Sequence, residues 1–166
     1  MESDAFRLSA FMPYRLAVLA ERVSRRLSVE YGRTKGLTVA EWRVLVHLQR
    51  GGRISVREIH NHVNLEKPRV SRAVGRLERA GLVEKTSSEG DGRLVAISLT
   101  MAGLKVLSEV LPAATAFEAR LLEGLRADEL TTFLSVLEKI HEVLDTDPDA
   151  KPRAPMDLQD VPGMSD

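Results

Sequence analysis

The chain has 166 residues, of which 43% are hydrophobic but only 4% aromatic, enough for one domain or for a small domain with long accessory helices. Its 24 basic and 24 acidic side chains cancel, which taken alone argues against a nucleic-acid partner. Beyond Thr146, however, five aspartates face only Lys151 and Arg153, so this tail has a net charge of −3 and residues 1–145 carry +3. Affinity for nucleic acid depends on the charge of the presented surface rather than on the sum.

Several classes of protein are excluded by what the sequence lacks. There is no cysteine, which excludes disulfides, cysteine-based metal sites and thiol redox sensing. No apolar run approaches the length of about 20 residues that spans a bilayer. The first four residues, Met1 to Asp4, lack the basic start of a secretory signal. We therefore expect a cytoplasmic protein with no membrane partner.

Helix starts are marked clearly in the first half of the chain. Pro13 suits the first turn of a long helix, whose apolar stripe ends near Tyr31. Thr38-Val-Ala-Glu41 and Ser55-Val-Arg-Glu58 both have the spacing of a capping box, in which a hydroxyl and a carboxylate satisfy each other's backbone N–H groups. Each box is flanked by apolar staple residues. The pattern predicts helices starting at Thr38 and at Ser55.

The stretch from Ser55 to Arg79 predicts two short helices joined by a tight turn at residues 64–66. At 100° per residue, the second helix has an apolar back made of Val70, Val74 and Leu77. The opposite face carries four arginines: Arg69, Arg72, Arg76 and Arg79. The apolar face of such a helix can pack on a small core while its arginine face binds an anion. Duplex DNA is the leading candidate for that anion.

After Gly81 the apolar period changes from helix to strand. Leu82 to Thr86 and Arg93 to Leu99 favour strands, and the turn-rich tip from Ser87 to Gly92 joins them. With the preceding helices, this hairpin predicts a winged helix-turn-helix. The expected fold class is thus mainly α with a small β-hairpin wing, flanked by long dimerisation helices.

Two further helices follow. Thr100 caps the first, in which Pro112 is expected to cause a bend or interruption near Ser108–Leu111. Arg126-Ala-Asp-Glu129 has capping-box spacing with arginine in the cap position, and predicts a last helix from about 127 to 144.

The outer helices carry more apolar surface than the central module can cover, which predicts a homodimer that reads a palindromic site. The predicted organisation has four parts. They are an N-terminal arm and dimerisation helix over 1–36, the DNA-binding domain over 37–99, dimerisation helices over 100–145, and a disordered tail over 146–166.

Over roughly residues 10–145, the sequence resembles the MarR family of bacterial transcription regulators. The resemblance rests on four blocks in the family's order and spacing, which are Leu37-Thr38-x-x-Glu41-Trp42, Val70-Ser71-Arg72-x-Val74-x-x-Leu77-Glu78-x-x-Gly81-Leu82-Val83, Asp91-x-Arg93 and Leu99-Thr100-x-x-Gly103. The blocks are specific only in combination. The resemblance implies a dimer with a winged helix in each arm.

The resemblance also implies which residues contact DNA. From the presented helix these are Lys67, Pro68, Arg69, Ser71, Arg72 and Arg76. At the wing, Arg93 would enter the minor groove while Asp91 holds the wing in shape. Ser55, Arg57 and Lys85 complete the predicted set, and no metal or cofactor is expected. Independently of the family, arginine offers a bidentate fork to guanine or phosphate, and a narrow minor groove attracts its charge.

The family often releases DNA when a small aromatic acid or phenol binds between the dimer region and the winged helix. Arg15, Trp42, Arg43 and His47 are candidates to line such a site, although their spacing does not require it. Members that take aromatic acids often carry a basic residue midway along the first helix, where this chain has the apolar stretch Leu16 to Leu19.

Other interpretations compete with a repressor. The arginine face could be a solvated surface of a protein–protein interaction module, or the chain could bind small molecules without DNA. His60 and His62 point about 200° apart on a helix and cannot share a metal ion. Catalysis finds no support, because there is no cysteine, Gly-rich phosphate loop or His-x-x-x-His pair.

Overall fold

The computed structural model describes residues 6–55, 58–87 and 95–153. The chain is mainly helical with three short strands in this order: η1 (Leu8–Ala10), α1 (Met12–Lys35), α2 (Val39–Gly51), β1 (Ile54–Ser55), α3 (Ile59–His62), α4 (Lys67–Arg79), β2 (Val83–Ser87), β3 (Val95–Leu99), α5 (Met101–Leu122) and α6 (Ala127–Asp145). This is the predicted fold class, a winged helix-turn-helix with long flanking helices.

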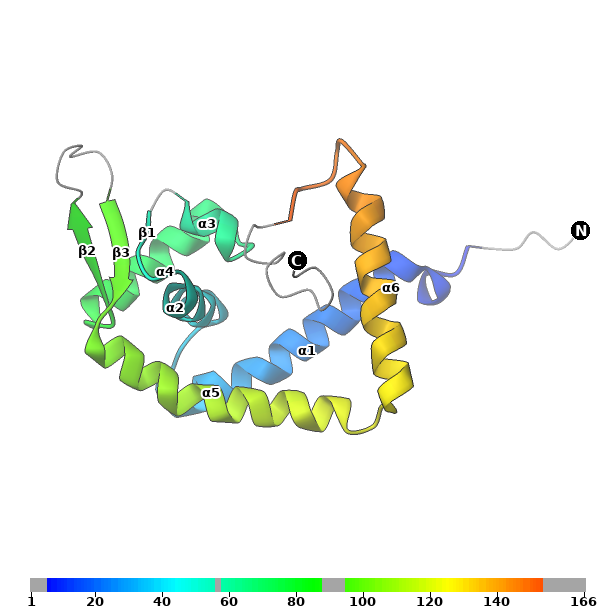
Figure 1. Ribbon diagram of the computed structural model, residues 1–166, viewed down its shortest axis with the longest axis horizontal. Coiled ribbons are helices and arrows are strands. Elements are labelled where there is room, and N and C mark those ends of the chain that lie inside the picture. The colour runs from blue at the N-terminus through cyan, green and yellow to red at the C-terminus, as the bar shows by residue number, and fades with distance from the viewer. Residues whose placement is uncertain (1–5, 56–57, 88–94, 154–166) are drawn as a thin grey trace, which may run out of the picture.

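The elements are arranged around two long helices, α1 and α5, which lie side by side (Figure 1). The compact module of α2, α3, α4 and the sheet sits at one end of this pair. At the other end α6 rises from the end of α5 and crosses α1 (Figure 1). The first described residues, with η1, lie at the end of α1 far from the sheet (Figure 1).

The predicted helix starts at Thr38 and Thr100 are confirmed. The Thr38 hydroxyl accepts from the backbone N–H of Glu41, and the Glu41 carboxylate accepts from the backbone N–H of Thr38 at 2.7 Å. The Thr100 hydroxyl accepts from the Gly103 N–H at 3.0 Å and donates to the Gly81 carbonyl at 2.7 Å. Thr100 therefore ties the start of α5 to the end of α4.

The second predicted capping box, at Ser55 and Glu58, is wrong. Ser55 lies in β1 opposite Ala96, and α3 begins four residues later without a side-chain cap. The sheet is antiparallel in the order β1-β3-β2, so the predicted hairpin gains a third strand that local sequence did not reveal. Ser55 stays extended because its backbone pairs with β3. The hydrogen bonds between these two strands satisfy backbone N–H and C=O groups that would face solvent if Ser55 were a helix cap.

Pro112 does not interrupt α5, which is continuous from Met101 to Leu122. Val110 and Phe117, on either side of the proline, are buried. The Arg26 guanidinium of α1 lies over the Phe117 ring, 5.4 Å from its centroid. Burial of this face against α1 outweighs the one backbone hydrogen bond that proline removes.

A single core joins the module to the two long helices. It contains Tyr31 from the end of α1, the buried faces of α2 and α4, and Leu107 and Val110 from α5. The sheet contributes Ile54, Val83 and Ile97, of which Ile97 at the centre of β3 is fully buried. The module therefore depends on α1 and α5 for part of its core.

The opposite half is covered much less. No residue of α6, all of which is described, is buried. Large apolar side chains are exposed along α6, at the end of α5 and in the N-terminal arm: Phe133, Leu134, Val136, Val143, Leu144, Leu121, Leu125, Phe6, Leu8, Phe11, Met12 and Tyr14. Within the described ranges, every helix is too short or too polar to cross a lipid bilayer.

The segment after α6 turns back along the helix. Arg153, only 15% exposed, pairs with Glu138 at 2.6 Å and also with Asp145. Lys151 donates to the Asn64 side chain at 3.1 Å. The rest of the predicted tail, 154–166, lies outside the described residues.

A close approach at Gly103 provides a test of the α4–α5 junction. A Cβ atom there would lie 2.1 Å from the Leu82 carbonyl oxygen, so the helix would have to shift. We expect Gly103→Ala to lower the free energy of unfolding by about 1–3 kcal/mol in urea titrations. Gly75→Ala is the control, since nothing lies within 4 Å of that position and it should gain about 0.5–1 kcal/mol. Equal stability of wild type and Gly103→Ala would contradict this packing.

Candidate nucleic-acid interface

The candidate interface is α4, the second helix of the helix-turn-helix. It starts with Pro68 in its first turn, where the missing N–H costs nothing, and ends before Gly81, which has a φ of 69°. Val70, Ala73, Val74 and Leu77 form its buried back. The opposite face is exposed, as predicted.

The exposed face of α4 carries cations that form no ion pair with the residues that the structure describes. Lys67, Arg69 and Arg72 are exposed and have no ion-pair partner among the described residues. Pro68 and Ser71 are exposed beside them. These positions occupy the first half of the helix, whose N-terminus also attracts anions. The face is therefore available to a polyanion without first breaking an ion pair.

Arg76 differs from these cations because it ties α4 to α2. Its Nε atom donates to Glu41 Oε1 at 2.7 Å, and its side chain is 46% exposed while that of Glu41 is 9% exposed. A terminal nitrogen also reaches the Thr38 hydroxyl at 3.5 Å. The capping box of α2 and the predicted DNA-contacting helix thus share one hydrogen-bonded cluster.

Glu41 is kept charged by this cluster. Burial raises the pKa of its carboxyl, but the hydrogen bonds from Thr38 and Arg76 and the charge of Arg76 outweigh it and leave the pKa below its ordinary value. No local signal in the sequence pointed to this pair, because its two members are 35 residues apart.

The other predicted DNA contacts are distributed differently. Ser55 is half-buried in β1. Lys85, in β2, pairs with Glu78 at 2.5 Å. Arg57, Asp91 and Arg93 lie outside the described residues.

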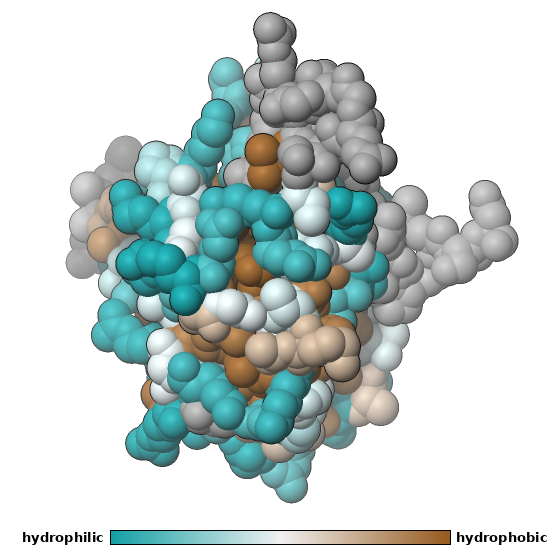
Figure 2. All heavy atoms as spheres, turned by 90° about the vertical axis from the view of Figure 1, so that its left-hand side faces the viewer, coloured by the Kyte–Doolittle hydropathy of each residue, from teal (hydrophilic) through white to brown (hydrophobic). Residues whose placement is uncertain are grey.

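Sequence analysis overlooked Arg53, which precedes β1 and donates to the Thr86 hydroxyl of β2. It adds an exposed cation beside the wing, which is revealed only by the strand pairing. Figure 2 shows this end of the molecule, where hydrophilic side chains surround a central band of apolar ones.

His60 and His62 are half-buried, and the Nδ1 atoms of both are buried without a hydrogen-bond partner in the described structure. Among the described residues, no group of three or more histidine or acidic side chains is placed to hold a metal ion.

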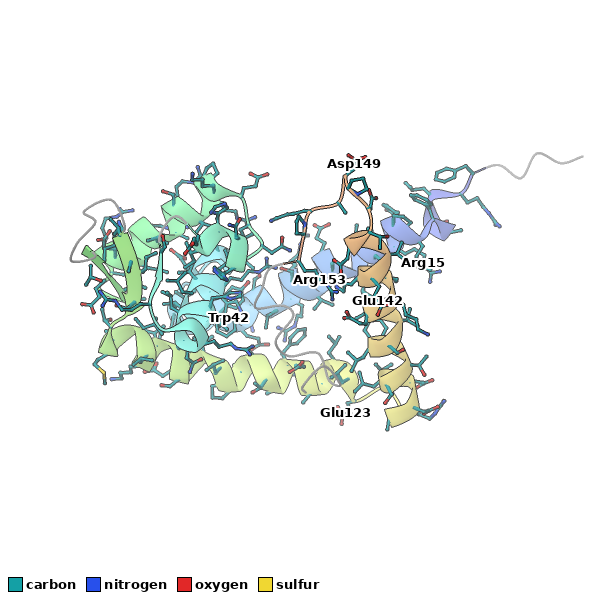
Figure 3. All side chains as sticks on the ribbon, turned by 45° about the horizontal axis from the view of Figure 1, so that its top comes forward. Arg15, Trp42, Glu123, Glu142, Asp149 and Arg153 are labelled. Carbon is teal, nitrogen blue, oxygen red and sulfur yellow. The ribbon has the colours of Figure 1, made fainter. Side chains whose placement is uncertain are left out.

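A second feature is an apolar cavity of about 890 Å³, open to solvent on one side and lined by α1, α2, α5 and α6. Trp42 and Arg43, two of the four predicted ligand-binding residues, line it, whereas Arg15 and His47 do not. Arg15 lies near the start of α1, well separated from Trp42 (Figure 3). Most of the remaining wall is aliphatic, with Ser24, Glu129 and His141 as its polar members.

Arg43 also has partners in the helix-turn-helix. Its Nη1 atom donates to the backbone carbonyls of Val63 at 3.2 Å and Asn64 at 3.5 Å, in the turn between α3 and α4. Trp42 stacks on the buried ring of Tyr31, with centroids 5.5 Å apart and planes at 12°. Burial raises the pKa of the Tyr31 hydroxyl, and Arg43 and Arg69 partly oppose that rise.

A winged helix-turn-helix with an exposed basic helix face is typical of the DNA-binding modules of transcription regulators. Comparisons with known proteins agree. The sequence model described as MarR family matches residues 35–94. The chain is 30% identical over 113 residues to the HTH-type transcriptional repressor MdtR of Bacillus subtilis, covering 68% of this chain and 73% of that protein.

Solved structures share the fold. The MarR family regulator Sco3205 of Streptomyces coelicolor, in complex with DNA, has a TM-score of 0.75 at 21% identity, covering 90% of this chain and 96% of that one. The structure describing regulation of DNA binding of Bordetella bronchiseptica BpsR by 6-hydroxynicotinic acid has a TM-score of 0.64 at 23% identity, covering 76% and 98%. The chain belongs to the MarR family and is a DNA-binding transcription regulator rather than an enzyme.

The lowered pKa of Glu41 generates a pH-dependent prediction. A carboxyl with a folded pKa below its unfolded value, about 4.3, stabilises the protein above that pH and loses the effect as pH falls through the folded pKa. We expect Glu41→Gln to lower the unfolding free energy by about 1 kcal/mol at pH 7, and the difference to shrink below about pH 4.

Urea unfolding of both proteins across this pH range provides the measurement, with the exposed Glu118→Gln on α5 as control. A difference between wild type and Glu41→Gln that is unchanged from pH 7 to pH 3 would rule out the proposed charge of Glu41 as its source.

Proposed function

We propose that this regulator is a homodimeric repressor that binds a palindromic operator and is released by a small aromatic ligand. Residues 37–99 supply the DNA-binding domain, and residues 1–36 and 100–145 supply the dimerisation helices. The observation that carries this proposal is the exposed face of α4, on which Lys67, Arg69 and Arg72 have no ion-pair partner among the described residues.

The roles of individual side chains follow from their chemistry. Arg69 and Arg72 offer forked donors to guanine or phosphate in the major groove, while Lys67 and Ser71 contact the backbone. The family resemblance assigns the minor-groove contact at the wing to Arg93, with Asp91 as its neighbour; both lie outside the described residues. Arg76 contributes mainly by holding α4 against Glu41. MdtR is named a repressor, which supports repression as the direction of regulation. Sco3205 is described in complex with DNA, which supports DNA as the partner.

Dimerisation is supported by the apolar side chains exposed on α6, at the end of α5 and in the N-terminal arm. Phe133 and Leu134 are 42% and 46% exposed on adjacent positions of a helix with no buried residue. An apolar surface of this kind is ordinarily covered by a partner. Twofold symmetry would place two α4 helices about 34–36 Å apart, in successive major grooves on one face of the duplex.

Release by a ligand is supported by the cavity between the module and the outer helices. A ligand that binds better to one separation of the two α4 helices favours the dimers with that separation. The shift in their population is limited by the difference in the ligand's affinity for the two conformations. DNA binding by BpsR, which has a similar fold, is regulated by 6-hydroxynicotinic acid, an aromatic acid.

The first experiment is binding to the duplex upstream of the protein's own gene, titrated with salt. We expect two chains per site, and a steep linear fall in log K with log salt, because several phosphates are neutralised. Arg72→Ala should weaken binding by about 1–3 kcal/mol with little change in slope, whereas Lys67→Ala should reduce the slope by about one.

Arg33→Ala, an exposed arginine at the end of α1, is the control and should bind as wild type. Salt-independent binding no better than to random duplex would favour the interaction-module alternative instead. Retention of full affinity by Arg72→Ala would remove that residue from the interface.

The dimer has a separate test on α6. Leu134→Glu places a charge in the exposed apolar face and should shift the protein from dimer to monomer in sedimentation velocity. Operator affinity should fall with it, since one arm alone makes half the contacts. Thr132→Glu, exposed on the same helix, is the matched control. A Leu134→Glu protein that sediments as wild type would place the dimer contact elsewhere.

A further inference from the structure

Residues 146–153 follow α6 as a chain reversal that their own sequence builds. The Asp147 carbonyl accepts from the Ala150 N–H at 3.1 Å, and the Asp147 carboxylate accepts from the Asp149 N–H at 3.0 Å. Pro148, between the two aspartates, has the fixed φ that suits the second position of such a turn. The reversal directs the chain from the end of α6 towards α3 (Figure 1).

Arg153 anchors the far end of this segment on α6. Its Nη1 atom donates to Glu138 at 2.6 Å and its Nη2 atom donates to Asp145. Glu138 and Asp145 are seven residues apart, which places them on one face of α6. Figure 3 shows Arg153 between α6 and the module. One guanidinium bonded to two carboxylates holds the segment more firmly than a single exposed ion pair would.

Lys151, between the reversal and Arg153, reaches the helix-turn-helix. Its Nζ atom donates to Oδ1 of Asn64 at 3.1 Å, across 87 residues of sequence. Asn64 lies in the tight turn between α3 and α4 and has a φ of 49°, a left-handed conformation rare outside glycine. Its backbone carbonyl accepts from Arg43 of α2 at 3.5 Å. The turn is thus contacted by α2 at its backbone and by the C-terminal segment at its side chain.

The surroundings of Lys151 explain how one exposed contact can matter. A lysine on an unattached chain end gains little from a single hydrogen bond, because the conformational entropy lost on ordering the chain is of similar size. Here the reversal at Asp147 and the two bonds of Arg153 already order the segment on both sides of Lys151. Lys151 therefore meets Asn64 with little further loss of entropy.

We propose that residues 146–153 form a strap that holds the turn between α3 and α4, and that Lys151 is a positioning residue for DNA binding by α4. Asn64 lies three residues before α4, whose first turn carries Lys67 and Arg69. A turn held in one conformation presents these cations in one arrangement, so less conformational entropy is lost on binding. The inference rests on the proposed role of α4 in contacting DNA, and adds a residue from outside residues 37–99.

The first test is backbone amide exchange, which needs no DNA. The N–H groups of Val63, Arg69 and Val70 are hydrogen-bonded on either side of the turn. In full-length Lys151→Gln they should exchange about three- to tenfold faster than in wild type, the effect of losing one hydrogen bond. Arg153→Gln should give a similar rise, because it detaches the strap from α6.

Two controls accompany the exchange measurement. Arg33→Gln also removes one positive charge from an exposed side chain, and should exchange as wild type. Urea unfolding should give Lys151→Gln and Arg153→Gln a cooperative transition, which shows that the faster exchange reflects local opening of the turn rather than loss of the fold.

The second test is binding to the duplex upstream of the protein's own gene. Lys151→Gln should weaken binding about three- to tenfold, with an unchanged slope of log K against log salt, because Lys151 neutralises no phosphate. A phosphate contact would instead reduce the slope by about one. Lys151→Arg keeps a charged donor and should recover most of the affinity. Arg33→Gln should bind as wild type.

The contact with Asn64 has its own test. Asn64→Gly removes the acceptor of Lys151 and tolerates the left-handed backbone. In this background, Lys151→Gln should change neither amide exchange nor DNA affinity further, because the bond is already absent.

Three results would overturn the inference: unchanged amide exchange in Lys151→Gln, a salt slope reduced by about one, or a full effect of Lys151→Gln in the Asn64→Gly background. Faster exchange with unaltered affinity would overturn the positioning role as well. If the exchange results hold but the wild type binds no duplex, the strap stands and the proposed function fails. The two failures are therefore distinguishable.

Discussion

Burial of one face of α4 is the constraint on which the rest of the structure depends. Val70, Val74 and Leu77 each contribute about 1.5–3 kcal/mol by leaving water. The partly exposed Glu41–Arg76 pair contributes less, since exposed ion pairs add about 1 kcal/mol or below. Burial of apolar side chains thus attaches α4 to the module, and the polar contacts determine its orientation there. Because the back is fixed, the arginine face must point outward.

The polar contacts between α2 and the helix-turn-helix act at different places. Glu41 reaches Arg76 near the end of α4, while Arg43 reaches the turn before its start. Both acceptor and donor come from the first two turns of α2, the same turns that place Trp42 on the cavity wall. In the proposed release by a ligand, neighbouring residues of α2 would connect the cavity to the DNA-facing helix.

The half of the molecule with the winged helix buries more of its apolar surface than the half with α6, and this difference has a consequence for function. The core of the module draws on Tyr31, Leu107 and Val110, so α1 and α5 are rigid extensions of it. In contrast, no residue of α6 is fully buried within one chain. In the proposed dimer, movements of the outer helices would pass along α1 and α5 to both modules and alter the separation of the two α4 helices.

The sequence by itself determined what neighbouring residues decide: the caps at Thr38 and Thr100, the two faces of α4, and the family motifs. These signals are reliable because a hydroxyl three residues from an N–H, or a helical period of 3.6, acts within one element. Tertiary structure alone decided the pairing that draws Ser55 into β1, the attachment of Arg76 to Glu41, and the exclusion of Arg15 and His47 from the cavity. Each of these depends on groups brought together by burial of the core, where a distant strand or carboxylate competes with local preference and wins.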